Sequence, residues 1–225
     1  MREGDNWSYS FWTYVADQCR SNREDGKVSS KLPIIYLARH GQTEWSKSGQ
    51  HTGLTDIPLL PEGEYDAERL GARLRKIQFA AVWTSPLVRA ARTCELAGFG
   101  GMAKVDPDLV EWNYGEYEGL TNAQIQERYQ GWRVFEHGCP GGETPEQVAA
   151  RADRVLARAR AAGGNVLLFS SGHFTRMLGA RWIGLPPVSG ELFTLATASL
   201  SGLGYEHNLN EPVIQLWNDV SHYEE

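Results

Sequence analysis

The sequence predicts an α/β fold, a three-layer αβα sandwich with a mainly parallel central sheet. From Leu32 onward, short apolar runs alternate with amphipathic stretches, which is typical of strands joined by crossover helices. Polar side chains follow directly after three of the apolar runs, at residues 39–40, 85–89 and 171–173. Ligands of open α/β sheets bind at the edge where such strands end. We therefore expect three strand ends to bring chemistry to one place.

Composition limits the kind of protein and its partners. With 225 residues, 41% of them hydrophobic and 22% charged, the chain suits one large domain of a soluble protein. The formal net charge of −6 is a poor match for nucleic acid or an anionic membrane, and no apolar run is long enough to span a bilayer. We expect neither a nucleic-acid nor a membrane partner, and a homo-oligomer stays an open option.

The cysteines and the N-terminus bear on location and domain organisation. Cys19, Cys94 and Cys139 are odd in number and far apart, so they form neither a CxxC pair nor a disulfide framework. A reducing, cytoplasmic location is the simpler interpretation. Residues 1–33 mix aromatic and charged residues without the apolar centre of a signal peptide. We interpret them as an N-terminal extension of unknown role, followed by one domain over residues 34–225.

The first half of that domain contains two predicted strands, each followed by a helix. Residues 34–38 form a compact apolar run, as expected of a buried strand. The helix over residues 61–77 has a proline in its first turn, acidic residues beside it and an apolar stripe. Residues 80–84 are predicted as a second strand, and residues 87–96 as the helix that follows it.

The second half continues the alternation and then changes to strands. Thr144 and Gln147 form a capping box with a proline after the cap, so a helix begins there and ends near Gly163. Residues 165–169 are a third buried strand, and a helix is predicted to follow it through Trp182. Further strands, some of them antiparallel, are predicted at residues 192–197, 200–205 and 213–217.

The tripeptide Arg39-His40-Gly41 directly follows the first predicted strand. In such a place an arginine fork can grip two phosphate oxygens while an imidazole nitrogen attacks phosphorus. Glycine would let the backbone approach the phosphate closely. Taken alone, however, the tripeptide is better explained as an ordinary turn with a surface histidine, and its surroundings have to decide.

Those surroundings resemble a known family. The run RHGQTEWSKSGQHTGLTDIPL at residues 39–59 resembles the signature of the histidine phosphatase superfamily, which includes the cofactor-dependent phosphoglycerate mutases, and within it the sedoheptulose-bisphosphatase-like sugar phosphatases. The resemblance extends from near residue 34 to near residue 217. It implies a phosphoglycerate-mutase-like fold and a phosphatase that acts through a phosphohistidine on a small phosphorylated substrate, such as a sugar phosphate or bisphosphate, with no metal and no cofactor.

The resemblance also assigns roles to single residues. The catalytic set that it implies comprises the phosphorylated histidine His40, the phosphate-binding arginines Arg39 and Arg89, and the proton donor Glu111. Two guanidinium groups can neutralise charge on the phosphoryl oxygens without a metal, and a protonated carboxyl can supply the leaving group with a proton. The substrate contacts that we expect lie at Gln42, Ser46, Thr52, Gly53, Ser171 and Gly172. Neighbouring carboxylates at Glu116 and Glu118 are rivals of Glu111, and Arg92 is expected to make surface contacts.

The chain departs from the family pattern at the third strand end. Members usually carry a histidine directly before the glycine of this segment, and here that position is Ser171, followed by Gly172 and His173. Ser171 can donate one hydrogen bond but carries no positive charge. Three interpretations stay open: His173 replaces the missing imidazole as a catalytic residue, Ser171 suffices together with the N–H groups of the following helix, or turnover is weakened. His173 could instead serve only as a helix cap.

Three functions are therefore compared. The first is hydrolysis of a small phosphomonoester. The second is mutase-type phosphoryl transfer, which needs a covered site, whereas the segment between Gly119 and Glu143 is shorter than the insertion of the mutases. The third is a phosphate-binding protein with weakened turnover, an option that Ser171 keeps open.

The other histidines and the large aromatics complete the survey. His51, His137, His207 and His222 show no metal-ligating spacing, so we expect no metal site and place them at the surface, with His51 near the region where relatives contact substrate. Three large aromatics could contact a substrate, but packing is the more common role of such side chains; these are Trp112, Tyr114 and Trp132.

Overall fold

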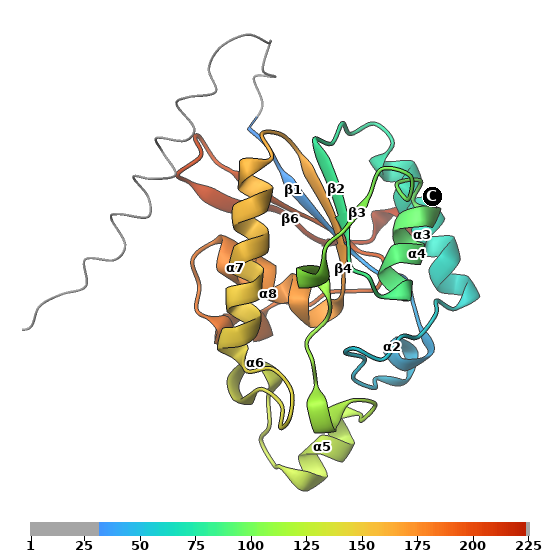
Figure 1. Cartoon of the computed structure of the whole chain (residues 1–225), viewed down its shortest axis with the longest axis vertical. Helices are drawn as coiled ribbons and strands as arrows, with labels where there is room; N and C mark the ends of the chain where they lie inside the picture. The colour runs from blue at the N-terminus through green and yellow to red at the C-terminus, as the bar shows by residue number, and fades with distance from the viewer. Residues whose placement is uncertain (1–31, 224–225) are drawn as a thin grey trace, which may run out of the picture. The chain divides into compact units, whose positions relative to one another are not determined.

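A computed structural model describes residues 32–223. In this part of the chain one six-stranded sheet has the order β3-β2-β4-β1-β5-β6 (Figure 1). The pairs β3-β2, β2-β4 and β4-β1 are parallel, while β1-β5 and β5-β6 are antiparallel. This mainly parallel sheet confirms the predicted α/β fold. Its strands are β1 (Ile35–Arg39), β2 (Ala81–Thr84), β3 (Lys104–Val105), β4 (Val166–Ser170), β5 (Leu200–Tyr205) and β6 (Pro212–Asp219).

Helices cover both faces of the sheet, which confirms the three layers. α3 and α4 lie on one face, and α7 and α8 lie on the other (Figure 1). The short helices α2, α5 and α6 lie beyond the carboxyl ends of the parallel strands, so they surround the edge where the polar residues gather. The helices are α2 (Glu44–Ser48), α3 (Pro61–Leu74), α4 (Val88–Leu96), α5 (Asn122–Arg128), α6 (Val134–His137), α7 (Pro145–Ala161) and α8 (Gly172–Trp182).

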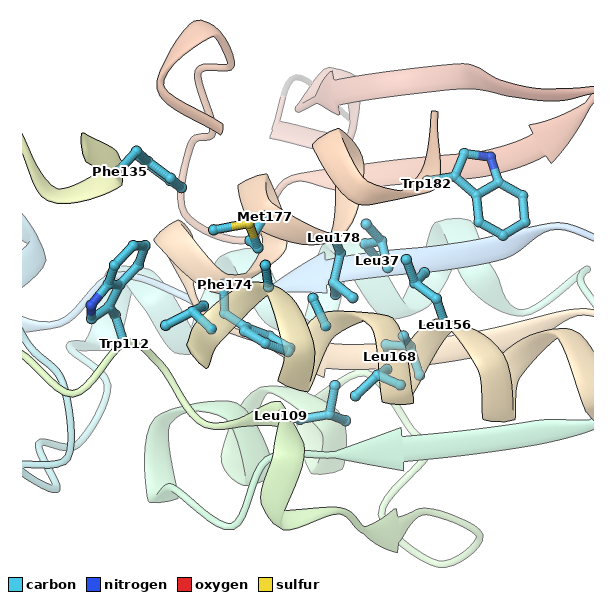
Figure 2. Packing of buried hydrophobic residues seen from close by; sticks show 14 of the residues in the cluster. Leu37, Leu109, Trp112, Phe135, Leu156, Leu168, Phe174, Met177, Leu178 and Trp182 are labelled. Carbon is cyan, nitrogen blue, oxygen red and sulfur yellow. The ribbon is translucent and has the colours of Figure 1, made fainter. Parts of the chain in front are cut away.

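The two central strands supply both cores by simple alternation. In β1, Ile35 and Leu37 pack toward α7 and α8, while Ala38 packs toward α3 and α4. In β4, Leu168 belongs to the first cluster and Phe169 to the second. Successive side chains of a strand point to opposite faces, so a continuous apolar run is what a strand covered on both faces requires. Figure 2 shows the first cluster, where Leu37 and Leu168 meet the side chains of α7 and α8.

The helix signals in the sequence hold at α7. Thr144 Oγ1 accepts a hydrogen bond from Gln147 N, and Gln147 Oε1 accepts one from Thr144 N, so both halves of the capping box are present. The helix stops just before Gly163, whose φ of 74° is the left-handed conformation that glycine adopts easily.

The predicted strand at residues 192–197 is wrong. Leu192 ends a 3-10 helix (Pro187–Leu192), and residues 193–197 form a loop. The backbone groups of this loop bond side chains instead of a neighbouring strand, so they cannot form a ladder. The carbonyl of Thr194 accepts from Trp217, the carbonyl of Leu195 accepts from Arg39, and the N–H of Ala196 donates to Asn218.

Some of the expectations lie outside the described residues. Cys19 and residues 1–31 of the predicted N-terminal extension belong to this group. Cys94 and Cys139 are buried free thiols. In residues 32–223, no helix is both long and apolar enough to cross a membrane.

Gly41 provides a test of how the loop after β1 is held. A Cβ on Gly41 would lie 2.2 Å from the carbonyl oxygen of Gly63 in α3, so a side chain would push the loop and the helix apart. We expect Gly41→Ala to destabilise the fold by about 1–3 kcal/mol, as overpacking does, and to lower the melting temperature by several degrees. Gly101→Ala is the control, because a Cβ there meets no atom within 4 Å. Equal melting curves for both variants would contradict the close contact.

Candidate active site

The polar strand ends meet around a cavity of about 180 Å³, which we call the inner cavity. It lies where the parallel strands end, the edge predicted from the sequence. Of the expected residues, those that line it are Arg39, His40, Ser46, Thr52, Glu111, Gly172 and His173. Gln42, Gly53, Arg89 and Ser171 are not part of its lining.

His40 has a defined tautomer. Its side chain is buried, and Nδ1 lies 2.7 Å from the carbonyl oxygen of Gly41. Because a carbonyl can only accept, Nδ1 carries the proton and Nε2 keeps its lone pair. Among residues 32–223, Nε2 has no hydrogen-bond partner. Burial, with Arg89 and Arg39 nearby, lowers the pKa of His40 well below its usual 6.5, so the ring is neutral near pH 6.

Two arginines add positive charge beside His40. Arg39 lines the inner cavity, where it donates to the carbonyl of Leu195 while its Nε has no partner in the described part of the chain. Arg89 is fully buried behind the cavity wall, and its terminal nitrogens donate to the carbonyls of Thr52, Gly53 and Thr55. Arg89 thus holds the loop after α2 in place and contributes charge, not a free fork, to the site.

Glu111 caps helix α8 from a different segment of the chain. Its Oε1 accepts hydrogen bonds from the N–H groups of Trp112 and Phe174, at 2.9 and 2.8 Å, and its Oε2 accepts one from the N–H of His173 at 2.9 Å. The positive end of a helix dipole stabilises a carboxylate in this position. The rival Glu118 instead accepts from the N–H groups of Gly53 and Thr55.

Because Glu111 caps the helix, the hydroxyl of Ser171 is left free. Ser171 is the N-cap residue of α8, but its side chain makes no capping bond. The hydroxyl is fully buried and has no partner within residues 32–223. A buried hydroxyl without a partner costs free energy.

His173, in the first turn of α8, forms hydrogen bonds through both its backbone and its ring. Its backbone N–H donates to Glu111, and its ring bonds the hydroxyl of Tyr114 through Nδ1. The ring lies parallel to that of His51, with centroids 5.9 Å apart. Burial lowers the pKa of His173 well below 6.5, and Arg176 lowers it further. The side chain therefore reaches the cavity wall as a neutral imidazole.

The other expected substrate contacts have structural partners as well. Ser46 shares a capping box with Thr43 at the start of α2. Gln42 accepts a hydrogen bond from the N–H of Leu60 through its carbonyl and stays away from the cavity. Arg92 makes surface ion pairs with glutamates, as expected. In residues 32–223, no group of three or more His, Cys, Asp or Glu side chains could hold a metal ion.

Among the described residues that line the cavity, five received no role from the sequence, namely Trp45, Gly49, Gln50, Arg176 and Leu195. Tyr114 was left open between packing and substrate contact. Tyr114 and Arg176 lie in the same short segments as Glu111 and His173, so their positions in the motifs could have indicated them. Trp45 is held at the cavity by α2, and Leu195 by the loop that was expected to be a strand. No pattern of residue types reveals these two.

His222 was expected at the surface, and this expectation is wrong. The side chain is 1% exposed, and its Nε2 donates to the carbonyl of Ala198. Ala198 has a φ of 47°, a conformation that costs free energy for a residue with a Cβ. The N–H of the same residue donates to the carbonyl of His40 at 2.9 Å. His222 thus helps to hold the strained residue that fixes the backbone of His40.

Comparisons with known proteins agree on one family. Residues 35–220 match the model of a protein family described as "Histidine phosphatase superfamily (branch 1)". An acid phosphatase of Mycobacterium tuberculosis is 41% identical over 181 residues, which are 79% of this chain and 89% of the relative. The sedoheptulose 1,7-bisphosphatase of Saccharomyces cerevisiae is 37% identical over 190 residues, 70% of each chain. A solved structure of a Mycobacterium tuberculosis open reading frame is 39% identical, has a TM-score of 0.79, and covers 83% of this chain and 97% of its own.

The hydrogen bond from His222 to the carbonyl of Ala198 can be tested by substituting His222. We expect His222→Phe to leave the carbonyl of Ala198 without its donor, which costs about 1–3 kcal/mol of stability, and to lower turnover more than substrate affinity because His40 loses its support. Melting curves and phosphatase kinetics measure both. His207→Phe, at an exposed histidine, is the control. If the two variants behave alike, His222 does not support the site.

Proposed function

The chain belongs to the histidine phosphatase superfamily (branch 1), and we propose that it is a phosphatase that hydrolyses small phosphomonoesters through a phosphohistidine at His40. Phosphorylated sugars are the substrates that we favour, because one of its relatives is a sedoheptulose bisphosphatase. The observation that carries the proposal is the tautomer of His40, with Nδ1–H held by the carbonyl of Gly41.

That hydrogen bond makes His40 a nucleophile. The lone pair on Nε2 attacks phosphorus, the bond from phosphorus to the ester oxygen breaks, and a bond from Nε2 to phosphorus forms. The ring then carries positive charge, which the Gly41 carbonyl stabilises through Nδ1–H. In the second step water attacks phosphorus, the N–P bond breaks, phosphate leaves, and His40 returns to its neutral tautomer.

The arginines stabilise the charge on the phosphoryl oxygens. In phosphoryl transfer a protein acts mainly by positioning groups and by neutralising charge. Arg39 lines the inner cavity with a free Nε, and Arg89 adds a second buried charge behind the wall. Together the two guanidinium groups can neutralise the phosphoryl charge without a bound metal ion.

We assign the proton donor for the leaving group to Glu111. Within residues 32–223 its Oε2 accepts one N–H, whereas Oε1 accepts two. Glu111 gives its proton to the leaving oxygen and becomes a carboxylate, whose two oxygens keep these three N–H partners. The same carboxylate then takes a proton from the attacking water.

Ser171 bears on how fast the reaction runs. In place of the family's imidazole it offers a neutral hydroxyl that has no partner among the described residues, so we infer that it donates to a phosphoryl oxygen. His173, two residues further along the chain, lines the inner cavity with a neutral imidazole. This arrangement favours a phosphatase of modest turnover over one that has lost catalysis, because His40, Arg39 and Glu111 keep their positions.

The nucleophile can be tested by phosphate release from a panel of sugar phosphates. We expect His40→Ala to lose activity by a factor of about 10³ or more, because no other group replaces the nucleophile. Ser171→His is expected to raise activity about tenfold or more, because an imidazole can carry the positive charge that the hydroxyl lacks beside the anion. Ser171→Ala is the matched control and is expected to lower activity only several-fold.

Equal activity of the wild type and His40→Ala would overturn the proposal. The mutase alternative is tested separately, by supplying 3-phosphoglycerate with a bisphosphorylated activator and following isomerisation. Isomerisation that exceeds phosphate release would favour the mutase. Unchanged activity in Ser171→His would show that the hydroxyl serves the reaction as well as an imidazole does.

The lowered pKa of His40 predicts the pH dependence. A histidine whose pKa lies well below 6.5 stays neutral, and therefore nucleophilic, as the pH falls through 6. The acid limb of kcat/KM is then expected below pH 6.5, which agrees with a relative named acid phosphatase. A profile between pH 4 and 8 at constant ionic strength measures it. An acid limb at or above pH 6.5 would contradict a neutral His40.

A further inference from the structure

A second cavity adjoins the inner one. It has a volume of about 700 Å³ and lies beside α5 and α6. We call it the distal cavity. It shares His51 and His173 with the inner cavity, so these two stacked rings form the boundary between them. The residues that line only the distal cavity are Asn122, Gln126, Gly131, Trp132, Arg133 and Val134.

The volumes of the two cavities suit different parts of a substrate. Pockets for drug-sized molecules measure about 300–1,000 Å³. The inner cavity, at about 180 Å³, is below that range and suits a phosphoryl group with the first atoms of its ester. The rest of a larger substrate has to lie elsewhere, and the distal cavity begins directly behind His51 and His173.

The charges of the two cavities differ. Arg39 and Arg176 line the inner cavity. Arg133 is the one Lys or Arg among the residues that line the distal cavity, and it makes ion pairs with Glu136 and Glu191. Two carboxylates therefore surround this cation. A second phosphoryl group, or a carboxylate, would have to compete with them.

The remaining groups suit hydroxyls and carbon skeletons. Nδ2 of Asn122 has no hydrogen-bond partner in the described part of the chain, and its Oδ1 accepts only a long bond of 3.5 Å from Gln126. An amide both donates and accepts, as a hydroxyl does. His51 and Trp132 both line the distal cavity, and their rings meet edge to face with centroids 5.4 Å apart. Aromatic walls with a few polar groups are typical of sites for small neutral molecules.

We propose that the distal cavity binds the uncharged, hydroxylated part of a sugar monophosphate whose phosphoryl group occupies the inner cavity. This inference rests on the proposed phosphatase function and sharpens it. A sugar with one phosphoryl group fits both cavities. A bisphosphate or a phosphorylated acid places its second negative charge beside Glu136 and Glu191, where repulsion opposes binding.

Three substrates distinguish the effect of substrate size on kcat/KM from the effect of substrate charge: glycerol 3-phosphate, fructose 6-phosphate and fructose 1,6-bisphosphate. We expect the highest kcat/KM for fructose 6-phosphate, about tenfold or more above the other two. Asn122→Ala is expected to lower that value about fivefold, the effect of one hydrogen bond, and to lower the value for glycerol 3-phosphate by a clearly smaller factor. Asn210→Ala, an exposed asparagine in the turn between β5 and β6, is the matched control and should change neither substrate.

The inference is overturned if the bisphosphate is preferred, or if Asn122→Ala lowers the short and the long substrate by the same factor. Its failure differs from a failure of the proposed function, because the latter is judged by His40→Ala on glycerol 3-phosphate alone. Dissociation constants of the three compounds, measured by calorimetry with His40→Ala, provide a second ranking that does not depend on turnover. The same order of affinities is expected there, and the opposite order overturns the inference.

Discussion

The site depends on the last two residues of β4, to which the segments that follow β1 and β2 are bonded. The N–H of His40 donates to the carbonyl of Ser170 at 2.9 Å, and on the other side the N–H of Ser85 donates to the carbonyl of Phe169 at 3.0 Å. Each bond extends a parallel ladder just past a strand end. His40, the segment that leads to Arg89 and the start of α8 are therefore fixed to one strand, so the residues around the inner cavity are held by a buried, rigid sheet.

Glu111 solves a second constraint at the same point. A helix that begins beside a phosphate site has free N–H groups, and in α8 the carboxylate of another segment takes up two of them. Arg151 holds that segment by donating to the carbonyls of Asp108 and Val110. The helix is thus stabilised without its own N-cap side chain. This explains how Ser171 can be buried with an unused hydroxyl at the start of an intact helix.

Sequence patterns predicted what local physics determines. The alternation in β1 and β4, the capping box at Thr144 and the polar strand ends all followed from periodicity and turn chemistry. The strand expected at residues 192–197 and the surface position expected for His222 were wrong, because tertiary partners decided both. The backbone groups of the loop form hydrogen bonds with side chains such as Arg39. His222 lies in the interior, where its Nε2 donates to the carbonyl of Ala198. The second cavity depends on how separate segments pack, which no spacing of residues reveals.

The site combines charged guanidinium groups with a neutral histidine, and the usual pKa values of arginine and histidine explain this combination. The chain carries a net charge of −6, yet Arg39 and Arg176 line the inner cavity and Arg89 lies behind it. Burial lowers the pKa of all three guanidiniums, but from a starting value of 12.5, so they stay charged near neutral pH. Burial also lowers the pKa of His40, from a usual value of 6.5, and the charges of Arg89 and Arg39 lower it further. Desolvation and the neighbouring guanidiniums together therefore place charged arginines beside a neutral histidine, whereas a lysine in place of an arginine would lose its charge more readily on burial.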